Sequence, residues 1–430
     1  MIMQDNEKKP ALRFKGFTDP WEQRKLGDAF ERVVRKNTNN ESRLPLTISA
    51  QDGLVDQITY FNNRVASRDV SNYYLVYNGE FAYNKSTSDG YPFGAVKRLD
   101  WYEKGVLSTL YIVFALKHPE KDDSDFMTVF YDTDRWHRGV AERAAEGARN
   151  HGLLNISADD FFDIDTTMPE DKVEQEKIGR LLKKLDTLIT LHQRKYEKLV
   201  NIKKSMLDKM FPQNGASMPE IRFKGFTDPW EQRKLDEAFD FTVPNNTLSR
   251  AELNQESGSV RNVHYGDVLI KYGSVLDAQN DELPFITGRS KDDFKGALLQ
   301  NGDIIIADTA EDETTGKVCE IVNIQDKDVV AGLHTMVCRP KNKTAEGYFG
   351  YYMNSSSYHH QLLPLMQGIK VLSLSKTNVQ KTTVKYPKDK AEQQKIADCL
   401  RRIDTLITLH QRKLEKLQNI KKSCLEKMFV

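Results

Sequence analysis

One stretch of 14 residues occurs twice, letter for letter, and this repeat constrains the fold more than any other feature. The stretch RFKGFTDPWEQRKL runs from Arg13 to Leu26 and again from Arg222 to Leu235. A second pair of stretches is nearly identical: EQEKIGRLLKKLDTLITLHQRKYEKLVNIKKS from Glu174 and EQQKIADCLRRIDTLITLHQRKLEKLQNIKKS from Glu392. The chain is therefore an internal duplication, in which the repeated parts are expected to contact each other or a common partner.

The segments between the repeated parts, residues 27–168 and 236–386, show no obvious likeness to each other. Two unlike domains carried on one duplicated frame indicate a protein that recognises two different things. A chain of 430 residues has room for two domains, each with its own core. The predicted plan is a first domain with its N-terminal repeat at 1–168, a first helix at 169–211, a linker, repeat and second domain at 212–386, and a second helix at 387–430.

Both near-identical stretches are predicted to be long helices that pair along a coiled-coil seam, because their apolar residues alternate in steps of four and three. The predicted pairing residues are Ile178, Leu182, Leu185, Ile189, His192, Tyr196 and Leu199 and, at a constant offset of 218, Ile396, Leu400, Ile403, Ile407, His410, Leu414 and Leu417. An additional apolar stripe, expected to dock partner helices, consists of Leu181, Leu188, Ile202, Leu406 and Ile420. The two histidines are interpreted as seam residues rather than metal ligands, because neither has a carboxylate or a second histidine at ligand spacing.

The linker FPQNGASMPE, from Phe211 to Glu220, contains the Pro, Gly and Ser residues that allow the chain to reverse. After such a reversal the two helices lie antiparallel, and the duplicated halves gain a pseudo-twofold axis. At 1.5 Å per residue, a helix from Glu174 to Met210 is about 55 Å long and can act as a spacer. The predicted fold class is α+β, with two globular mixed α/β domains joined by two long antiparallel coiled-coil helices.

The formal net charge of +1 conceals an uneven distribution of charge. Residues 172–209 contain 11 Lys or Arg against 5 Asp or Glu, and residues 390–427 contain 10 against 5. The variable segments are acidic, with 16 basic against 23 acidic residues at 28–170 and 15 against 20 at 236–387. Nucleic-acid binders usually show a basic patch. The balance therefore argues against nucleic-acid binding, unless basic side chains cluster locally or a partner supplies the phosphate contacts.

Neither the apolar runs nor the first residues indicate a membrane or secreted protein. The longest apolar runs, such as Val106 to Leu116, are short and interrupted, so the protein is expected to be cytoplasmic. The four cysteines, Cys319, Cys338, Cys399 and Cys424, lie too far apart for a CxxC pair. Neither a structural zinc site nor a disulfide framework is expected.

The first variable segment is rich in aromatic residues, with 15 of them between Tyr73 and Trp136. Runs such as Tyr73 to Tyr77 and Leu110 to Phe114 are predicted as strands. Most of the rings are assigned to the core, with stacking on single-stranded nucleic acid as the alternative. The polar residues that are best placed to reach base edges or phosphates from exposed loops are Lys85, Ser86, Tyr91, Lys97 and Arg98. For any one of these residues, a solvated loop position is the simpler interpretation.

The second variable segment contains YGDVLIKYGS, from Tyr265 to Ser274, and NGDIIIADTAED, from Asn301 to Asp312. Each is predicted as a Gly-Asp turn that leads into a buried strand. The aspartates of the second motif do not favour a metal-dependent nuclease, because no suitably placed lysine follows them. The candidates for nucleic-acid contact in this segment are Lys271, Tyr272, Arg289, Thr309, Lys370 and Ser373.

Motifs of several enzyme classes are missing from the sequence. There is no GxxxxGK[ST] loop for a nucleoside triphosphate, no Asn-Pro-Pro-Tyr or Asp-Pro-Pro-Tyr tetrad of an amino-methyltransferase, and no GxSxG motif. The chain is therefore predicted to catalyse no reaction.

In the order of its parts, the sequence resembles the specificity subunits of type I restriction-modification systems over nearly its whole length. The FAYNKS and GYPFGA runs at Phe81 to Ala95, GDIIIADTAED, and AGLHT at Ala331 to Thr335 are similar to stretches common in the target-recognition domains of that family. PEDKVEQEKI and PKDKAEQQKI close the two domains in the same order as in the family.

The resemblance implies that each variable domain reads one half of a bipartite, gapped site in duplex DNA. It also implies that the helices set the gap and dock two modification subunits, which hold S-adenosylmethionine and methylate adenine. A restriction subunit that uses ATP and magnesium then joins to cut unmethylated DNA, while this chain binds no cofactor itself. Modification subunits that help to clamp the duplex would account for the acidic domains. Two alternatives remain, a duplicated coiled-coil scaffold that binds proteins but no DNA and a fused enzyme.

Overall fold

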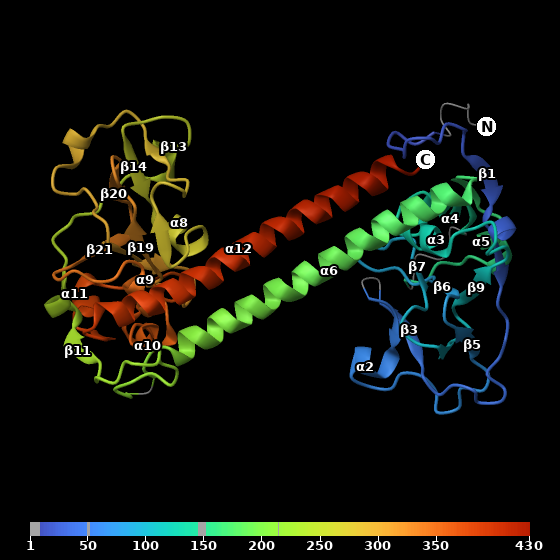
Figure 1. The fold of residues 1–430 in the computed structure, drawn as a ribbon, viewed down its shortest axis with the longest axis horizontal. Helices are drawn as coiled ribbons and strands as arrows, with labels where there is room; N and C mark the ends of the chain where they lie inside the picture. Colours follow the sequence, from blue (N-terminus) through green and yellow to red (C-terminus); the bar gives the residue numbers. More distant parts are fainter. Residues whose placement is uncertain (1–8, 50–51, 145–151, 214) are drawn as a thin grey trace. The chain divides into compact units, whose positions relative to one another are not determined.

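The computed structural model describes residues 9–49, 52–144, 152–213 and 215–430, which fold into two compact units (Figure 1). Unit 1 takes in Met1–Gln193 and Arg412–Val430, and unit 2 takes in Arg194–Gln411. Among the described residues, no helix combines the length and the apolar character that crossing a bilayer requires.

Unit 1 is built around a four-stranded antiparallel sheet of order β2-β9-β6-β7. Its strands are β1 Glu22–Lys25, β2 Phe30–Arg32, β3 Leu46–Ser49, β4 Gly53–Asp56, β5 Tyr74–Tyr77, β6 Phe81–Asn84, β7 Ala95–Arg98, β8 Lys104–Leu107, β9 Ile112–Leu116 and β10 Asp165–Met168. Its helices are α1 Leu26–Ala29, α2 Gln57–Phe61, α3 Ser124–Phe130, α4 His137–Arg143, α5 Ala158–Phe162 and the first part of α6 Lys172–Lys209. The strands predicted at Tyr73 to Tyr77 and Leu110 to Phe114 correspond to β5 and β9.

Both faces of this sheet are covered, and the alternation of side chains along each strand decides which residue enters which core. On β6, Phe81 and Tyr83 face a large aromatic core that includes Trp136 and Phe161 from the helices. The intervening Ala82 faces a smaller core formed with the outer strands β3, β5 and β8. The aromatic residues of the first segment are thus mainly core, as the sequence predicts.

Unit 2 contains a five-stranded sheet of order β12-β21-β17-β19-β15 and a four-stranded sheet of order β13-β16-β14-β20. Its strands are β11 Glu231–Lys234, β12 Phe239–Asp240, β13 Leu253–Asn254, β14 Val260–Val263, β15 Val275–Asp277, β16 Phe285–Ile286, β17 Ile304–Ala307, β18 Thr309–Ala310, β19 Val318–Val322, β20 Asp328–Ala331, β21 Thr335–Pro340, β22 Leu372–Ser373 and β23 Thr383–Tyr386. Its helices are α7 Leu235–Ala238, α8 Tyr265–Ile270, α9 Tyr348–Met353, α10 Ser356–His359, α11 Lys376–Gln380 and the first part of α12 Lys390–Lys427, with short 3-10 turns at Arg250–Glu252, Lys291–Phe294 and Leu363–Leu365.

The isoleucine run of the second segment forms the central strand β17. Ile304 and Ile306 enter one core while Ile305 enters another, so the strand is apolar on both faces. The strand predicted within Tyr265 to Ser274 is wrong, because Tyr265–Ile270 is helix α8. His264 caps this helix by accepting a hydrogen bond from the N–H of Gly266 at 3.1 Å. A short apolar run of this kind does not by itself distinguish a strand from a helix.

The repeated parts form the same frame in both units. In unit 1, β1 pairs antiparallel with β10, and in unit 2, β11 pairs antiparallel with β23. Glu174 lies in the first turn of α6, and its carboxylate accepts hydrogen bonds from Nε and Nη2 of Arg13 at 2.7 and 2.8 Å. The carboxylate of Glu392 in α12 accepts hydrogen bonds from Nε and Nη2 of Arg222 at 2.6 and 2.8 Å. Both carboxylates are 1% exposed, so each helix start is anchored to the 14-residue repeat by a buried bidentate ion pair.

The glutamine, lysine and isoleucine of the EQxKI motif complete each anchor. The side-chain amide of Gln175 donates to the carbonyl of Pro169 at 2.8 Å and accepts from the N–H of Asp123 at 2.8 Å. Gln393 does the same with Pro387 and Ala345, at 2.8 and 3.0 Å. The motif lysines, Lys177 and Lys395, lie over the rings of Phe17 and Phe226, and the motif isoleucines, Ile178 and Ile396, are buried in the two domain cores.

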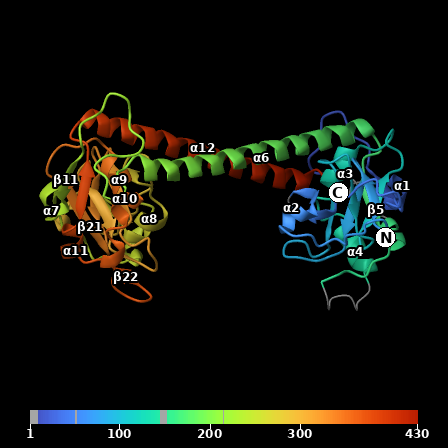
Figure 2. The ribbon, with the colours of Figure 1, turned by 90° about the horizontal axis from the view of Figure 1, so that it is seen from below.

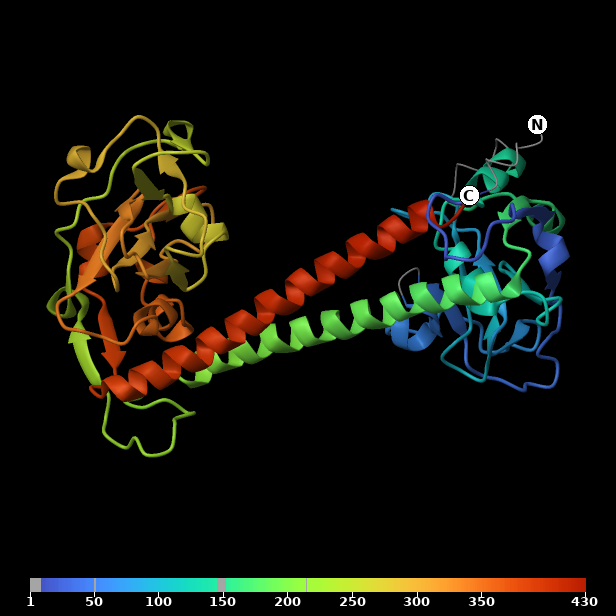
Figure 3. The same ribbon diagram turned by 45° about the horizontal axis from the view of Figure 1, so that its top comes forward.

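Within each unit the two helix segments run antiparallel (Figures 1 and 3). In unit 1 the start of α6 and the end of α12 share one core, and Asp186 pairs with Lys421 at 2.6 Å. In unit 2 Lys203 of α6 pairs with Asp404 of α12 at 2.6 Å. The offset of 218 that relates the two helix sequences takes Asp186 to Asp404 and Lys203 to Lys421, so the two ion pairs occupy equivalent positions in the repeat. The predicted fold class is therefore confirmed.

Candidate nucleic-acid interface

Three predicted contact residues of unit 2 lie together on one short two-stranded ladder and the turn that leads into it. Strand β18 pairs antiparallel with β22, and Thr309 stands opposite Ser373. The chain enters β22 through a hairpin turn, which Figure 2 shows beside the β22 label, and the residues at its ends, Gln367 and Ser373, exchange two main-chain hydrogen bonds of 3.0 and 2.8 Å. Lys370 is exposed on this turn, and its neighbour Ile369 is 99% exposed. We call this ladder and its turn the β18–β22 edge.

His334 adds an imidazole to this surface. Its Nδ1 lies 3.4 Å from the hydroxyl of Thr309 and 3.4 Å from a carboxylate oxygen of Asp308. The backbone of His334 has a φ of 52°, a left-handed conformation that few residues other than glycine adopt. Hydroxyl, imidazole and ammonium groups on one exposed edge have the chemistry that reads base edges and phosphates. Sequence reasoning quoted the AGLHT run but did not select its histidine.

Unit 1 has a corresponding edge at the corresponding place in its chain. Ser86, which follows β6, forms an antiparallel bridge with Leu153, and the N–H of Thr87 donates to the carbonyl of Gly152 at 2.7 Å. We call this the 86–153 edge. Ser86 is exposed on it, whereas the Nζ of Lys85 donates to the carbonyl of Ile156 at 3.3 Å.

The same order of elements surrounds both edges. The first pairing segment of each edge follows a central sheet strand, β6 or β17. The second precedes a short helix and the strand that returns to the frame, β10 or β23. Tyr91 lies apart from the 86–153 pairing, in a turn where its main chain bonds to Ser88, and its side chain is half-buried.

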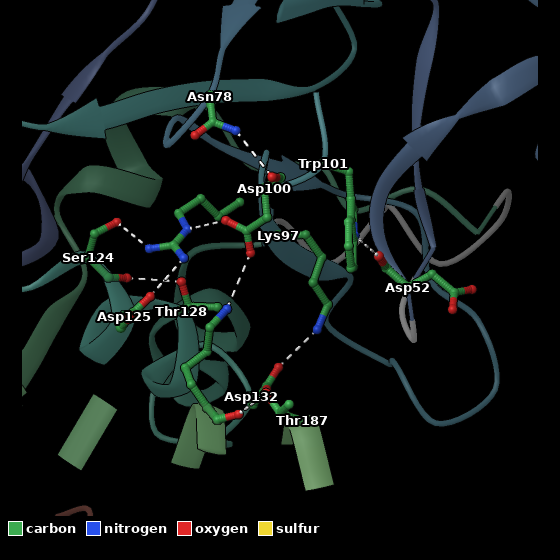
Figure 4. Close-up of polar contacts among 12 residues, drawn as sticks. Asp52, Asn78, Lys97, Asp100, Trp101, Ser124, Asp125, Thr128, Asp132 and Thr187 are labelled. Atoms are coloured by element: carbon green, nitrogen blue, oxygen red, sulfur yellow. Dashed lines mark hydrogen bonds and ion pairs between the residues drawn. The ribbon is translucent and has the colours of Figure 1, made fainter. Parts of the chain in front are cut away.

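Lys97 and Arg98 each form polar contacts within unit 1, and Figure 4 shows the contact of Lys97 with Asp132. Arg98 contacts Asp100, Asp125 and Ser124 at 2.6 to 2.7 Å. Burial lowers the pKa of Arg98, but its hydrogen bonds and charge contacts with these two aspartates outweigh burial and hold that pKa above the usual value. Lys97 pairs with Asp132 at 2.9 Å. These contacts argue against a direct role for either residue in binding nucleic acid.

The other candidates of unit 2 do not join the β18–β22 edge. Tyr272 is only 3% exposed, and its hydroxyl donates to the carbonyl of Glu282 at 3.1 Å, so its ring is part of the core rather than a stacking platform. Lys271 donates to the same carbonyl at 2.7 Å. Arg289 is exposed and lies 4.0 Å from Asp293.

The three aspartates near β17 each have a separate structural partner. Asp303 is buried and forms a bidentate ion pair with Arg339 at 2.7 and 2.8 Å. Asp308 contacts His334, and Asp312 accepts a hydrogen bond from the N–H of Thr314 at 2.8 Å. Their placement gives no support to a shared metal site.

The predicted helix residues divide into two groups according to what covers them. The residues nearest the helix starts are buried in the domain cores rather than in a helix-only seam: Ile178, Leu182 and Leu185 in unit 1, and Ile396 and Leu400 in unit 2. The remaining pairing residues, which are half-buried, are Ile189, His192, Tyr196, Leu199, Ile403, Ile407, His410, Leu414 and Leu417. The tighter packing at the helix starts reflects the cores against which they lie.

The predicted docking stripe is more open. Leu406 is 43% exposed and Ile420 is 39% exposed, whereas Leu188 and Ile202 are half-buried. Leu181 packs partly against the core of unit 1. One turn beyond Leu188 and Leu406, two further leucines, Leu191 and Leu409, are each 44% exposed. The helices therefore keep an apolar stripe that the described part of the chain leaves partly uncovered.

Comparison with known proteins relates part of this chain to one family. Residues 227–419 match the family model of the type I restriction modification DNA specificity domain. Over these residues the chain is similar to the DNA specificity domains of type I restriction-modification systems. A curated type I specificity subunit, that of the restriction enzyme MjaVIII of Methanocaldococcus jannaschii, is 24% identical over 331 residues, which cover 74% of this chain and 72% of that protein.

The specificity-subunit fold is also found in a solved structure. The S subunit of the type I restriction-modification system from M. genitalium superposes with a TM-score of 0.59 at 15% identity, over 98% of this chain and 99% of that chain. At this identity the likeness bears on the fold alone. The relatives found are specificity subunits, in keeping with the prediction that this chain catalyses no reaction.

Proposed function

We propose that the chain selects the DNA sequence for a type I restriction-modification complex, with each unit reading one half of a bipartite, gapped duplex site. The observation that carries this proposal is the pair of corresponding edges, the 86–153 edge and the β18–β22 edge. Each edge occupies the same place relative to the repeated frame of its own unit, but the two edges present different side chains. Two different readers carried on one repeated frame are what a bipartite site requires.

The β18–β22 edge has the groups needed for reading a groove. The hydroxyls of Thr309 and Ser373 and the ring of His334 can donate to or accept from base edges. Ile369 offers an apolar contact of the kind that suits a thymine methyl group, and Lys370 offers a charge for a phosphate. In unit 1, Ser86 has the corresponding place.

The helices are proposed to set the length of the gap and to dock two modification subunits through the docking stripe. In this assembly S-adenosylmethionine binds to the modification subunits, and ATP and magnesium bind to the restriction subunits. The complex acts on DNA in the cytoplasm. The specificity chain contributes recognition and geometry to the reaction, and no cofactor.

Exchange of one variable segment tests the proposal. The methylated positions are first mapped in DNA from cells that contain this chain and its partner subunits. Replacing residues 27–168 by the segment of another family member is expected to change one half-site and leave the other half-site and the gap intact. A change in both half-sites, or in neither, would overturn the proposal of independent readers.

A finer test uses the β18–β22 edge itself. Thr309→Ala with Ser373→Ala is expected to weaken discrimination at one half-site by about 1–3 kcal/mol. Thr287→Ala, an exposed threonine of the same unit away from this edge, is the matched control and should leave both half-sites unchanged. A protein-binding scaffold without DNA affinity predicts no salt-dependent binding of duplex DNA by the reconstituted complex. Absence of such binding would favour that alternative.

A further inference from the structure

A surface cavity in unit 1 is lined by arginines from two separate loops. It has a volume of about 370 Å³, and its lining residues are Asn40, Arg43, Arg64, Arg68, Asp69 and Val70. One loop follows β2, and the other follows α2. The guanidinium-bearing side chains are all exposed, so a ligand can reach them from solvent without any movement of the domain. We call this cavity the arginine pocket.

The walls of the arginine pocket are fixed by side chains that bond to the main chain. Asn37 is fully buried, and its amide donates to the carbonyls of Ser42 at 2.8 Å and Val70 at 3.4 Å, which ties the two loops together. Arg64 donates to the carbonyls of Ala66 at 3.3 Å and Ser67 at 3.1 Å. The loops therefore hold their shape before any ligand arrives.

The positive charge of the pocket is not compensated by ion pairs. No described residue forms an ion pair with Arg43, Arg64 or Arg68, although the segment that carries them has 23 acidic residues against 16 basic ones. By contrast, the other described arginines of this segment are paired with carboxylates, with the single exception of Arg32.

The one carboxylate of the pocket is also held locally. Asp69 accepts a hydrogen bond from the N–H of Ser71 at 3.0 Å, which lowers the pKa of this carboxyl group below its usual value. Asp69 therefore stays charged, and the lining has three positive charges against one negative charge. A net charge of this sign favours an anion.

Planar guanidinium groups suit phosphate oxygens, because each can present two parallel N–H donors. We infer that Arg43, Arg64 and Arg68 hold one backbone phosphate of the DNA duplex that unit 1 reads. The inference rests on the proposed function. It resolves the conflict between acidic domains and nucleic-acid binding, because a local basic cluster supplies a phosphate contact that the overall composition hides. Phosphate contacts of this kind fix the position of the protein on the duplex and carry no sequence information.

The salt dependence of DNA binding tests this inference. Each phosphate neutralised on B-DNA contributes about −0.9 to the slope of log Kobs against log salt concentration. The variant Arg43→Ala with Arg68→Ala is chosen, because Arg64 also holds its loop and is left in place. In the complex reconstituted with modification subunits, this variant is expected to bind duplex DNA with a slope that is shallower by about 0.9.

Two duplexes of equal length serve as probes, one with the mapped methylation site and one with both half-sites scrambled. The slope should fall equally on both duplexes, and the pattern of methylated bases should stay the same. Arg32→Ala, which removes an exposed arginine outside the pocket that forms no ion pair with any described residue, is the matched control and should leave the slope unchanged. The conservative variant Arg43→Lys with Arg68→Lys keeps the charges and should retain the wild-type slope.

The outcomes separate this inference from the proposed function. If the wild-type complex shows salt-dependent binding but the double alanine variant has the same slope, the inference fails and the proposed function stands. If Arg32→Ala changes the slope as much as the double variant does, the pocket has no special role and the inference is overturned. If the variant changes which bases are methylated, the arginines read bases, which also overturns it. If the wild-type complex binds no duplex, both proposals fall.

Discussion

Replacing Arg222 by alanine removes one side of the buried ion pair that anchors the start of α12. The side chain of Glu392 is 1% exposed and that of Arg222 is 13% exposed. Exposed ion pairs contribute about 0–1 kcal/mol, whereas removing one partner of a buried pair costs about 3–5 kcal/mol, because it leaves an uncompensated charge in the core. Because Glu392 is buried, the cost for a buried ion pair applies to the Arg222–Glu392 pair.

The remaining contacts of the carboxylate refine the magnitude. After loss of Arg222, Glu392 still receives the indole N–H of Trp230 at 3.3 Å. We therefore expect a loss of about 3 kcal/mol for Arg222→Ala, at the lower end of the range. In unit 1, the indole nitrogen of Trp21 is buried and has no hydrogen-bond partner among the described residues. Glu174 lacks that second donor, so Arg13→Ala is expected to cost more, about 4–5 kcal/mol.

Hydrogen exchange measured by mass spectrometry can follow each anchor separately. A loss of about 3 kcal/mol in the free energy of local opening speeds exchange of the most protected amides at the start of α12 by more than 100-fold. Lys209→Ala, which removes a solvent-exposed pair with Glu220, is the matched control and should change exchange less than tenfold. Adding Glu392→Gln to Arg222→Ala removes the stranded charge and should recover part of the protection. If Arg222→Ala behaves like Lys209→Ala, the argument from burial is refuted.

Three further outcomes are expected. Trp230→Phe should destabilise its unit by about 1 kcal/mol more than Trp21→Phe does, because only Trp230 loses a hydrogen bond, and hydrogen exchange of the two anchors measures the difference. Burial raises the pKa of Glu320 from 4.5 to about 7, so the folded chain binds this proton more tightly than the unfolded chain does. Its contribution to stability should therefore fall by about 3 kcal/mol as the pH rises from about 4.5 to 7 and stay constant above that. Urea denaturation of the wild type and Glu320→Gln at several pH values should show this slope in the wild type alone, and equal slopes would contradict the assignment. Tyr272→Phe should leave DNA affinity within twofold of the wild type in a binding titration, because the ring is buried, and a larger loss would restore this residue to the interface.

The parts of the fold that could be predicted from the sequence are those set by local pattern. The helices follow from apolar residues in steps of four and three, and the identical 14-residue stretches predict a common frame. The aromatic and β-branched runs correctly indicate β5, β9 and β17. Helix α8 was missed because Val268, Leu269 and Ile270 are compatible with either a strand or a helix. Only the cap at His264 and the exposure of Ile270 distinguish the two.

The candidate site was less predictable, because it depends on which distant residues meet. Ser86 and Thr309 could be selected from the turns that follow apolar strands, and they lie on the two corresponding edges. Arg98 could not be excluded in advance, because only Asp100 is near it in the sequence, whereas its second aspartate partner, Asp125, lies 27 residues away. The arginine pocket was missed for the same reason, since Arg43 and Arg64 come from different loops.

The leucines left open on the helices affect how the protein can be handled in the laboratory. Leu191 and Leu409 are both 44% exposed, and Leu406 is 43% exposed. Apolar side chains that recur along a helix without a cover favour self-association and precipitation. Production of this chain by itself should therefore yield little monodisperse material, and expression together with the modification subunits that are proposed to dock on this stripe should raise the recovery.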